Sequence, residues 1–310
     1  MEKHTNAPAQ PVLIVGSVAF DAIKTPTDGN NRILGGSATY GAVGASFFAP
    51  ARLVGVVGSD FGEADIARLK NRDIDLEGLQ IDKSGETFFW SGVYGENFAT
   101  RQTLETRLNV FADFKPDLPA AYKNTPFALL GNIQPSLQAM VLDQLANGSF
   151  TVADTMNLWI DVARPELLEL LPRVSLFILN DEEALQLTGE ANIFVAGPKL
   201  QQLGPKIVLI KKGPHGAVLF HPEGLFAIPA YPVTHVADPT GAGDSFAGAL
   251  VGCLAAANDT SIATMRRAVA YATVTASLTV ESLGLDRLEQ AGREEIDRRF
   301  EQLVRLTAFS

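Results

Sequence analysis

The chain has 310 residues, of which 46% are hydrophobic and 19% are charged, and its formal net charge is −10. This ordinary globular composition supports one large core, and an acidic balance without any basic block argues against nucleic acids and anionic membranes as partners. The single cysteine, Cys253, lies in an apolar run and cannot form an intrachain disulfide, which fits a reducing, cytoplasmic setting.

The chain begins with a polar stretch, MEKHTNAPAQ, which we expect to form a flexible N-terminus over residues 1–10. Residues 12–18, VLIVGSV, are nearly all apolar, as expected of a strand buried on both faces of a parallel sheet. Asp21 follows this strand. Because ligands bind outside the carboxyl ends of strands in open α/β sheets, Asp21 is a candidate to hold substrate hydroxyls. A simple turn carboxylate is the alternative.

The next residues indicate a hairpin and then a helix. Residues 22–34 are polar and contain the turn signal DGNN at 28–31, which predicts a hairpin outside the main sheet. Gly35 and Gly36 then open a small-residue helix that we expect to reach about Phe48. Paired glycines at a helix start let a ligand approach the backbone, and simple close packing is the alternative.

A second strand is expected at residues 52–57, followed by an amphipathic helix at 63–71. Residues 87–110 interrupt this alternation with two extended, aromatic-rich segments. A hairpin inserted in an α/β chain has few core contacts of its own, so a flap over the site or an interface between subunits is expected. The aromatic side chains suit a substrate pocket and a dimer contact equally.

From residue 127 onward strands and helices alternate regularly, which predicts a parallel sheet with helices on both faces. Strands are expected at 127–133, 150–154, 175–179 and 207–211, and helices at 135–146, 165–171 and 181–187.

Two polar clusters follow strands in this half of the chain. Asn180 and Glu183 share one face of a first helical turn and are candidates to orient waters on Mg²⁺, with N-capping as the alternative. Lys211, Gly213 and Gly216 offer a cation and two glycines suited to a nucleotide, with a plain β-turn as the alternative.

The stretch at 236–252, VADPTGAGDSFAGALVG, carries the clearest chemical signal. Gly241, Ala242 and Gly243 place small residues where a helix must begin, so an anion can sit on the exposed N–H groups and the positive end of the dipole. Asp244, beside that position, suits a general base that takes a proton from an attacking hydroxyl. A glycine-containing turn with an early-turn acid is the alternative. The apolar run at 247–257 is far shorter than the ~20 residues of a membrane span.

Two helices are expected after this stretch. The first, residues 261–283, has few charges, and its small and hydroxyl side chains leave room for a flat ring against the backbone. The second, residues 286–306, is charged and amphipathic, as expected of a closing surface helix.

Taken together, these residues resemble the ribokinase-like (PfkB) family of carbohydrate and nucleoside kinases over about residues 11–305. The resemblance is carried by DPTGAGDSFAGA (238–249) and, more weakly, by GGSATYGA (35–42), with NDEE (180–183) and KKGPHGA (211–217) fitting further family elements. It implies an α/β fold: a three-layer αβα sandwich with a mainly parallel central sheet and a small β lid. The lid would be built from segments at about 20–34 and 87–110, which often pair to form homodimers.

The resemblance also implies the chemistry, an ATP- and Mg²⁺-dependent phosphoryl transfer to an alcohol, usually a primary CH₂OH, of a small sugar, sugar acid or nucleoside. Asp244 would be the general base, and the helix start at 241–243 would be the anion hole. The other implied contacts are the acceptor on Asp21, Gly35 and Gly36, the nucleotide on Lys211, Gly213 and Gly216, Mg²⁺ through water on Asn180 and Glu183, and K⁺ near Asp238 and Gly284.

Two positions depart from the family pattern. Tyr40 stands where sugar kinases of the family carry an Asn that holds sugar hydroxyls, so its ring either stacks on the acceptor or reshapes the pocket. Thr273 stands where ribokinases bring an Asn towards adenine.

Other functions are disfavoured by the same residues. A non-catalytic sugar or nucleotide sensor on this scaffold would not need Asp244. A NAD(P)-dependent enzyme lacks its glycine fingerprint, because only Gly16 is present where three glycines are required. A P-loop kinase is excluded because no GxxxxGK[ST] motif occurs.

Overall fold

The structure is a computed structural model that describes residues 9–26, 28–96 and 100–308. The predicted flexible N-terminus therefore lies outside the described residues up to residue 8. None of the helices in the described part of the chain is long and apolar enough to cross a membrane.

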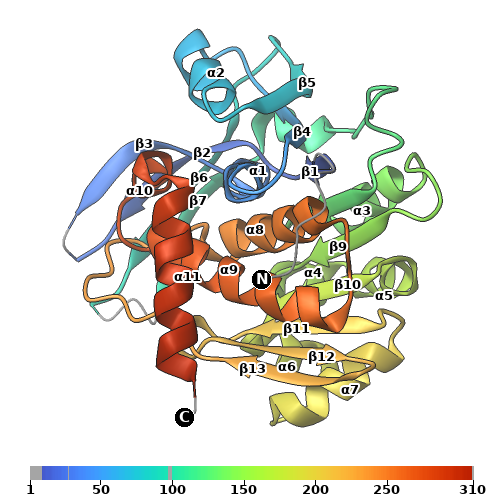
Figure 1. The fold of residues 1–310 in the computed structure, drawn as a ribbon. Helices are drawn as coiled ribbons and strands as arrows, with labels where there is room; N and C mark the ends of the chain where they lie inside the picture. The colour runs from blue at the N-terminus through green and yellow to red at the C-terminus, as the bar shows by residue number, and fades with distance from the viewer. Residues whose placement is uncertain (1–8, 27, 97–99, 309–310) are drawn as a thin grey trace.

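A nine-stranded sheet forms the centre of the molecule (Figure 1). Neighbouring strands pair in parallel from β11 through to β5, and β12 and β13 extend one edge in antiparallel pairing. In spatial order the strands are β13 (Gly224–Ile228), β12 (Ala217–His221), β11 (Ile207–Lys211), β10 (Leu176–Asn180), β9 (Phe150–Asp154), β8 (Phe127–Leu130), β1 (Val12–Val15), β4 (Ala51–Val57) and β5 (Ile74–Ile81).

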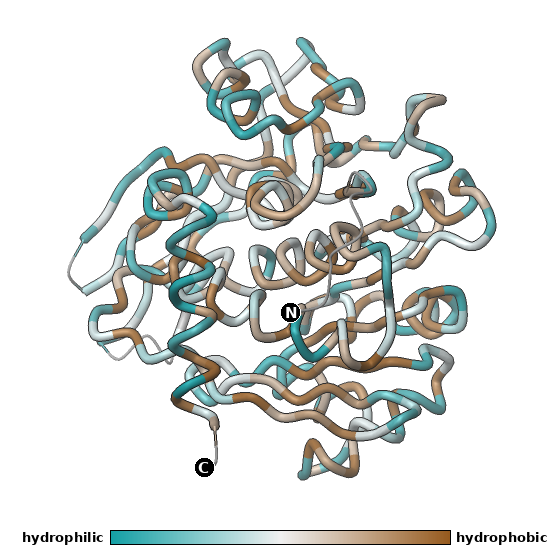
Figure 2. The backbone as a smooth tube through the Cα atoms, viewed as in Figure 1, coloured by the Kyte–Doolittle hydropathy of each residue, from teal (hydrophilic) through white to brown (hydrophobic). Residues whose placement is uncertain are grey.

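Each face of this sheet buries its own hydrophobic cluster, because successive side chains of a strand point to opposite faces. In β1, Val12 and Ile14 join one cluster while Leu13 and Val15 join the other. The central strands are accordingly hydrophobic along their length in Figure 2. The predicted near-continuous apolar strands are explained by this double burial.

Helices cover both faces and complete three layers. The first cluster is closed by α1 (Ser37–Ser46), α2 (Glu63–Lys70), α8 (Ala242–Ala257), α9 (Ile262–Thr279), α10 (Asp286–Gln290) and α11 (Arg293–Thr307). The second is closed by α3 (Pro135–Leu142), α4 (Asn157–Val162), α5 (Arg164–Leu170), α6 (Asp181–Thr188) and α7 (Ile193–Gln202).

A second sheet of four strands lies beside α1 (Figure 1). Its spatial order is β3 (Gly29–Gly35), β2 (Ala19–Lys24), β6 (Phe88–Tyr94) and β7 (Arg101–Arg107). The two hairpins are antiparallel, and β2 joins them by pairing in parallel with β6. The predicted fold class, a three-layer αβα sandwich with a mainly parallel sheet and a small extra sheet, is confirmed.

Some predicted boundaries are wrong, for identifiable reasons. The helix expected at 261–283 ends at Thr279, because the carbonyl of Val280 accepts hydrogen bonds from the N–H groups of Ala237 and Asp238. The helix expected at 286–306 is two helices, because Ala291 is extended and Gly292 forms a new N-cap.

Helices α1 and α8 touch through glycines. A Cβ on Gly248 would lie 2.0 Å from the carbonyl oxygen of Gly41, and a Cβ on Gly252 would lie 2.7 Å from that of Ala45. A Cβ on Gly44 would lie 2.5 Å from the carbonyl oxygen of Ser245. The two backbones are therefore closer than any side chain permits, and they bring both helix starts to the same end of the sheet.

Candidate active site

The start of α8 is shaped by Gly241. This residue is the N-cap and has a left-handed conformation (φ 75°, ψ −2°) that favours glycine. Glycine is also required for space, because a Cβ there would lie 2.4 Å from the ring of Tyr40. The turn before it is fixed by Asp238, whose Oδ1 accepts a 2.9 Å hydrogen bond from the N–H of Thr240. The predicted anion hole, Gly241 to Gly243, is therefore a rigid, partly exposed helix start.

The start of α1 has a comparable construction. Gly36 is its N-cap with φ 95°, and a Cβ on Gly36 would lie 2.4 Å from the carbonyl oxygen of Ser17. A Cβ on Gly35 would lie 2.1 Å from Oδ2 of Asp21. Gly35 therefore makes room for the carboxylate of Asp21, a residue of β2 that is only 4% exposed.

Three carboxylates share this region. Burial, and then the negative charges of Asp238 and Asp244, raise the pKa of Asp21 to about 8. Burial also raises the pKa of Asp238, although hydrogen bonds donated by Thr240 and by the backbone of Gly284 lower it in part. Of this acidic group, Asp244 lies in the first turn of α8 and is the partly exposed member.

Tyr40 lies among these carboxylates and is 1% exposed. Its pKa is raised well above the usual value by burial, and further by Asp21, Asp238 and Asp244. Its hydroxyl has no hydrogen-bond partner in the described part of the chain. Tyr40 therefore fills the space between the two helix starts and brings one polar atom into the acidic region.

The small sheet contacts the same region. The hydroxyls of Tyr94, at the end of β6, and Thr240 are 2.9 Å apart and hydrogen-bonded. Ile33 of β3 packs against Gly284, because a Cβ on Gly284 would lie 2.4 Å from Cγ2 of Ile33. The sequence pattern marked residues 87–110 as aromatic-rich without singling out Tyr94. Its contact with Thr240 depends on how the hairpin folds over α8.

Asn180 and Glu183 form a capping box at the start of α6. Asn180 Oδ1 accepts from the N–H of Glu183 at 2.8 Å, and Glu183 Oε2 accepts from the N–H of Asn180 at 2.7 Å. The capping contact considered as an alternative is thus present, and it holds both side chains at the carboxyl end of β10.

Lys211 joins these elements. Its Nζ lies 3.0 Å from Oδ2 of Asp154, the last residue of β9. A Cβ on Gly243 would lie 3.0 Å from the same Nζ. Burial lowers the pKa of Lys211, but Asp154, Glu183 and Asp244 outweigh it, so the pKa rises and the side chain is an ammonium. Asp154 was not assigned from the sequence, although its place at a strand end was a signal.

The remaining predicted residues have other surroundings. Gly216 is packed, because a Cβ there would lie 1.9 Å from the carbonyl oxygen of Ile228, whereas a Cβ on Gly213 would meet open space. The hydroxyl of Thr273 donates to the carbonyl of Val269 within α9. Within the described part of the chain, no hydrogen bond or ion pair joins these three residues to Asp21, Asp238 or Asp244.

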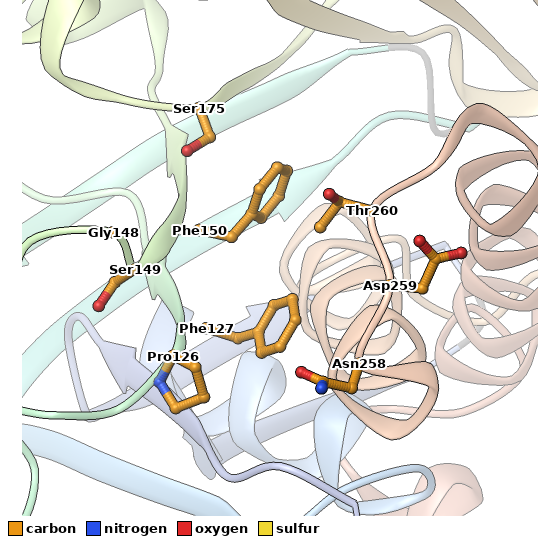
Figure 3. Close-up of a pocket in the computed structure, with 9 residues that line it drawn as sticks. All are labelled: Pro126, Phe127, Gly148, Ser149, Phe150, Ser175, Asn258, Asp259 and Thr260. Carbon is orange, nitrogen blue, oxygen red and sulfur yellow. The ribbon is translucent and has the colours of Figure 1, made fainter. Parts of the chain in front are cut away.

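A separate hollow in the described part of the chain lies at the opposite end of the sheet's strands. It has a volume of about 510 Å³ and is lined by Phe127 and Phe150, the first residues of β8 and β9. Figure 3 shows these rings facing the loop 258–260 that follows α8. The candidate active site is instead the group of side chains at the carboxyl ends of the strands, the carboxyl-edge cluster, which consists of Asp21, Tyr40, Asp154, Lys211, Asp238 and Asp244.

The burial of Asp21 has a measurable consequence for stability. Because its pKa rises from 3.8 in the unfolded chain to about 8 in the fold, the folded state holds the extra proton between these values. The free energy of unfolding therefore falls with rising pH across that window, by at most roughly 1.4 kcal/mol per pH unit. Asp21→Asn should remove this component. Urea unfolding of ligand-free protein at pH 5 and pH 8 measures the free energy of unfolding of both proteins. We expect the difference, variant minus wild type, to be more positive at pH 8 than at pH 5. An equal difference at both pH values would contradict the burial effect.

Comparisons with known proteins agree on one family. The family model described as pfkB family carbohydrate kinase matches residues 12–291. A cytidine kinase of Thermococcus kodakarensis is 29% identical over 244 residues, which are 76% of this chain and 86% of that protein.

Solved structures show the same fold. A Burkholderia thailandensis nucleoside kinase in complex with inosine superposes with a TM-score of 0.78 at 21% identity, covering 94% of this chain and 98% of that one. An Arabidopsis thaliana ribokinase complexed with ribose and ATP gives 0.76 at 21% identity, covering 94% and 99%.

Proposed function

The chain belongs to the pfkB family of carbohydrate kinases, and from this premise we propose that it transfers a phosphoryl group from ATP to a hydroxyl of a nucleoside or small sugar. A nucleoside is the acceptor we favour, because a relative that matches 76% of the chain is a cytidine kinase. A free sugar or sugar acid is the other acceptor class, and a primary CH₂OH is the hydroxyl we expect to react.

One observation carries the proposal. Asp244 stands in the first turn of α8, directly after the glycine-rich helix start and within electrostatic reach of both Asp21 and Lys211. A partly exposed carboxylate in that place is suited to take a proton from the acceptor hydroxyl. The N–H groups at 241–244 are suited to stabilise negative charge on the phosphoryl oxygens. Asp21 and the Gly35–Gly36 backbone would hold the acceptor, with Tyr40 lining the same space.

Asn180 and Glu183 would hold Mg²⁺ through water molecules. When bound, Mg²⁺ supplies positive charge that neutralises the phosphate oxygens during transfer. The residues fit, because Mg²⁺ keeps several waters and needs only one or two carboxylates together with substrate phosphates. Within the described residues, no group of three or more His, Cys, Asp or Glu side chains could hold a metal ion by itself.

Asp238 and the turn at Gly284 would hold K⁺. Asp238 is fully buried, and its Oδ2 has no hydrogen-bond partner among the described residues. A buried carboxylate oxygen without a partner is costly unless a positive charge lies beside it. A monovalent cation would supply that charge.

The nucleotide contacts are proposed at Gly213, Gly216 and Thr273. Gly213 offers open space for close approach to the backbone. Thr273 already donates its hydroxyl hydrogen to Val269, so it would meet adenine as an acceptor or by packing alone. Dimerisation through the small sheet stays a prediction.

A phosphorylation screen tests the proposal. Purified protein is incubated with Mg·ATP and, separately, cytidine, inosine, ribose and a sugar acid, and phosphorylated product is measured directly. We expect a nucleoside to be phosphorylated, and we expect KCl to give more product than NaCl at equal ionic strength. Failure of every acceptor to yield product would favour the alternative, a non-catalytic sensor, especially if the acceptors still bound in calorimetry.

A further inference from the structure

A buried ion pair at the carboxyl edge of the sheet was not anticipated from the sequence. Lys211 ends β11 and Asp154 ends β9, with β10 between them. Nζ of Lys211 lies 3.0 Å from Oδ2 and 3.3 Å from Oδ1 of Asp154, and the two side chains are 16% and 5% exposed. Asp154 is itself fixed, because its Oδ1 accepts the N–H of Thr155 and its carbonyl accepts Nε2 of Gln138, both at 2.9 Å.

The ammonium reaches the anion hole rather than the turn that follows its own strand. The position of a Cβ on Gly243 would be 3.0 Å from Nζ, so the charge lies directly against the first turn of α8. In the turn after β11, a Cβ on Gly213 would meet open space and a Cβ on Gly216 would meet the backbone of Ile228 and Pro229. A side chain larger than hydrogen at residue 243 would push Lys211 away, so the glycine and the lysine depend on each other.

Stability does not explain this pair. Removing two charges from water costs about as much as their attraction returns, so buried ion pairs contribute little net stability. An ammonium has three N–H donors, and both hydrogen bonds that Lys211 makes within the described chain go to Asp154. One donor is thus left for a ligand beside the helix start.

We propose that Lys211 is a catalytic residue that donates a hydrogen bond to a non-bridging oxygen of the transferring phosphoryl group, and that Asp154 is the positioning residue that holds its ammonium there. This rests on the proposed kinase function. In the step, the acceptor oxygen forms a bond to the terminal phosphorus and gives its proton to Asp244. The bond from that phosphorus to the bridging oxygen breaks, and its electron pair leaves with ADP. Lys211 keeps all its protons throughout.

Nucleotide binding tests the assignment without any turnover. Calorimetry compares Mg·ADP with Mg·AMPPNP, which differ by the terminal phosphoryl group. In Lys211→Met we expect the Kd for ADP to stay within about twofold of wild type and the Kd for AMPPNP to rise roughly 10-fold to 100-fold, the scale of one charge-assisted hydrogen bond. Equal weakening of both nucleotides would overturn the proposal and make Lys211 a general nucleotide contact. No change in either would leave Lys211 without a role.

Turnover gives the second test, with the acceptor identified by the screen. We expect Lys211→Met to lower kcat by about 10²-fold to 10³-fold with little change in the KM for the acceptor, as for loss of one oxyanion donor. Lys206→Met is the matched control, because Lys206 is exposed and stands just before the opposite end of β11. This control should keep wild-type values.

The role of Asp154 is tested by a double-mutant cycle. Asp154→Asn should lower kcat without changing the KM for the acceptor, yet add nothing to Lys211→Met. The double variant removes both charges and so keeps the test open if Lys211→Met alone folds poorly. Additive losses in kcat would overturn the positioning role. If wild-type protein phosphorylates no acceptor, the proposed function fails, and the ADP and AMPPNP comparison still decides the place of Lys211.

Discussion

Replacing Asp244 with Asn is expected to lower kcat by about 10²-fold to 10⁴-fold, the usual contribution of a positioned general base. Asparagine keeps the shape of the side chain at the start of α8 but cannot take a proton from the acceptor hydroxyl. It also removes a negative charge next to the anion hole, so nucleotide binding should be unchanged or slightly tighter. Steady-state kinetics and ADP calorimetry on the same preparation measure both effects.

A matched control separates this role from that of an ordinary acid in a first helical turn. Glu294 lies in the first turn of α11 and is exposed, far from the carboxyl-edge cluster in sequence. Glu294→Gln should lose only a few tenths of a kcal/mol of stability, with kcat unchanged. Wild-type turnover in Asp244→Asn would refute the assignment of the base and return Asp244 to the same structural role.

Replacing Gly248 with Ala is expected to destabilise the fold by about 2–4 kcal/mol, although alanine alone favours a helix by about 1 kcal/mol. The added methyl would lie 2.0 Å from the carbonyl oxygen of Gly41, 2.7 Å from its carbonyl carbon and 2.8 Å from its Cα. All three are backbone atoms, so no rotamer change relieves the clash and α1 must move away from α8. Urea unfolding monitored by circular dichroism measures the loss.

Gly292→Ala is the corresponding control. Gly292 is the N-cap of α11 with φ −95°, and a Cβ there would meet no atom within 4 Å. Its loss should not exceed the ~1 kcal/mol typical of a poorer N-cap residue. If Gly248→Ala has the same urea midpoint as the wild type, the added methyl group fits between α1 and α8, and the predicted clash is wrong.

The parts of the fold that could be predicted are those in which one strong local pattern decides the structure. Buried strands such as β1 and β11 are continuous apolar runs, and their double burial follows from the alternation of side chains. The family resemblance based on residues 238–249 is confirmed by a match over residues 12–291.

The parts that were not predicted depend on tertiary context. Strands β5 and β13 lie at the two edges of the large sheet, where one neighbour suffices and the apolar pattern is weak. Helix α7 contains Pro198, which normally argues against a helix, and Gly197 before it packs on the ring of Phe220.

The site shows the same limit. Sequence patterns located Gly241 and Gly243 but could not name the groups that require them, because Tyr40 and Lys211 reach those glycines from other elements. Asp154 is the last residue of the strand predicted at 150–154, but only the order of β9, β10 and β11 in the sheet brings it to Lys211. Pairings across a sheet depend on strand order, which no local pattern contains.

The backbone contact between α1 and α8 separates two problems that an enzyme designer would face. The separation between the Gly35–Gly36 pair and the helix start at 241–243 is set by main-chain atoms of two touching helices, so no side chain adjusts it. The small sheet, in contrast, meets this unit through side chains such as Tyr94 and Ile33. Grafting a different hairpin onto this scaffold should therefore exchange the molecule that is phosphorylated while the place of transfer stays where the helices put it.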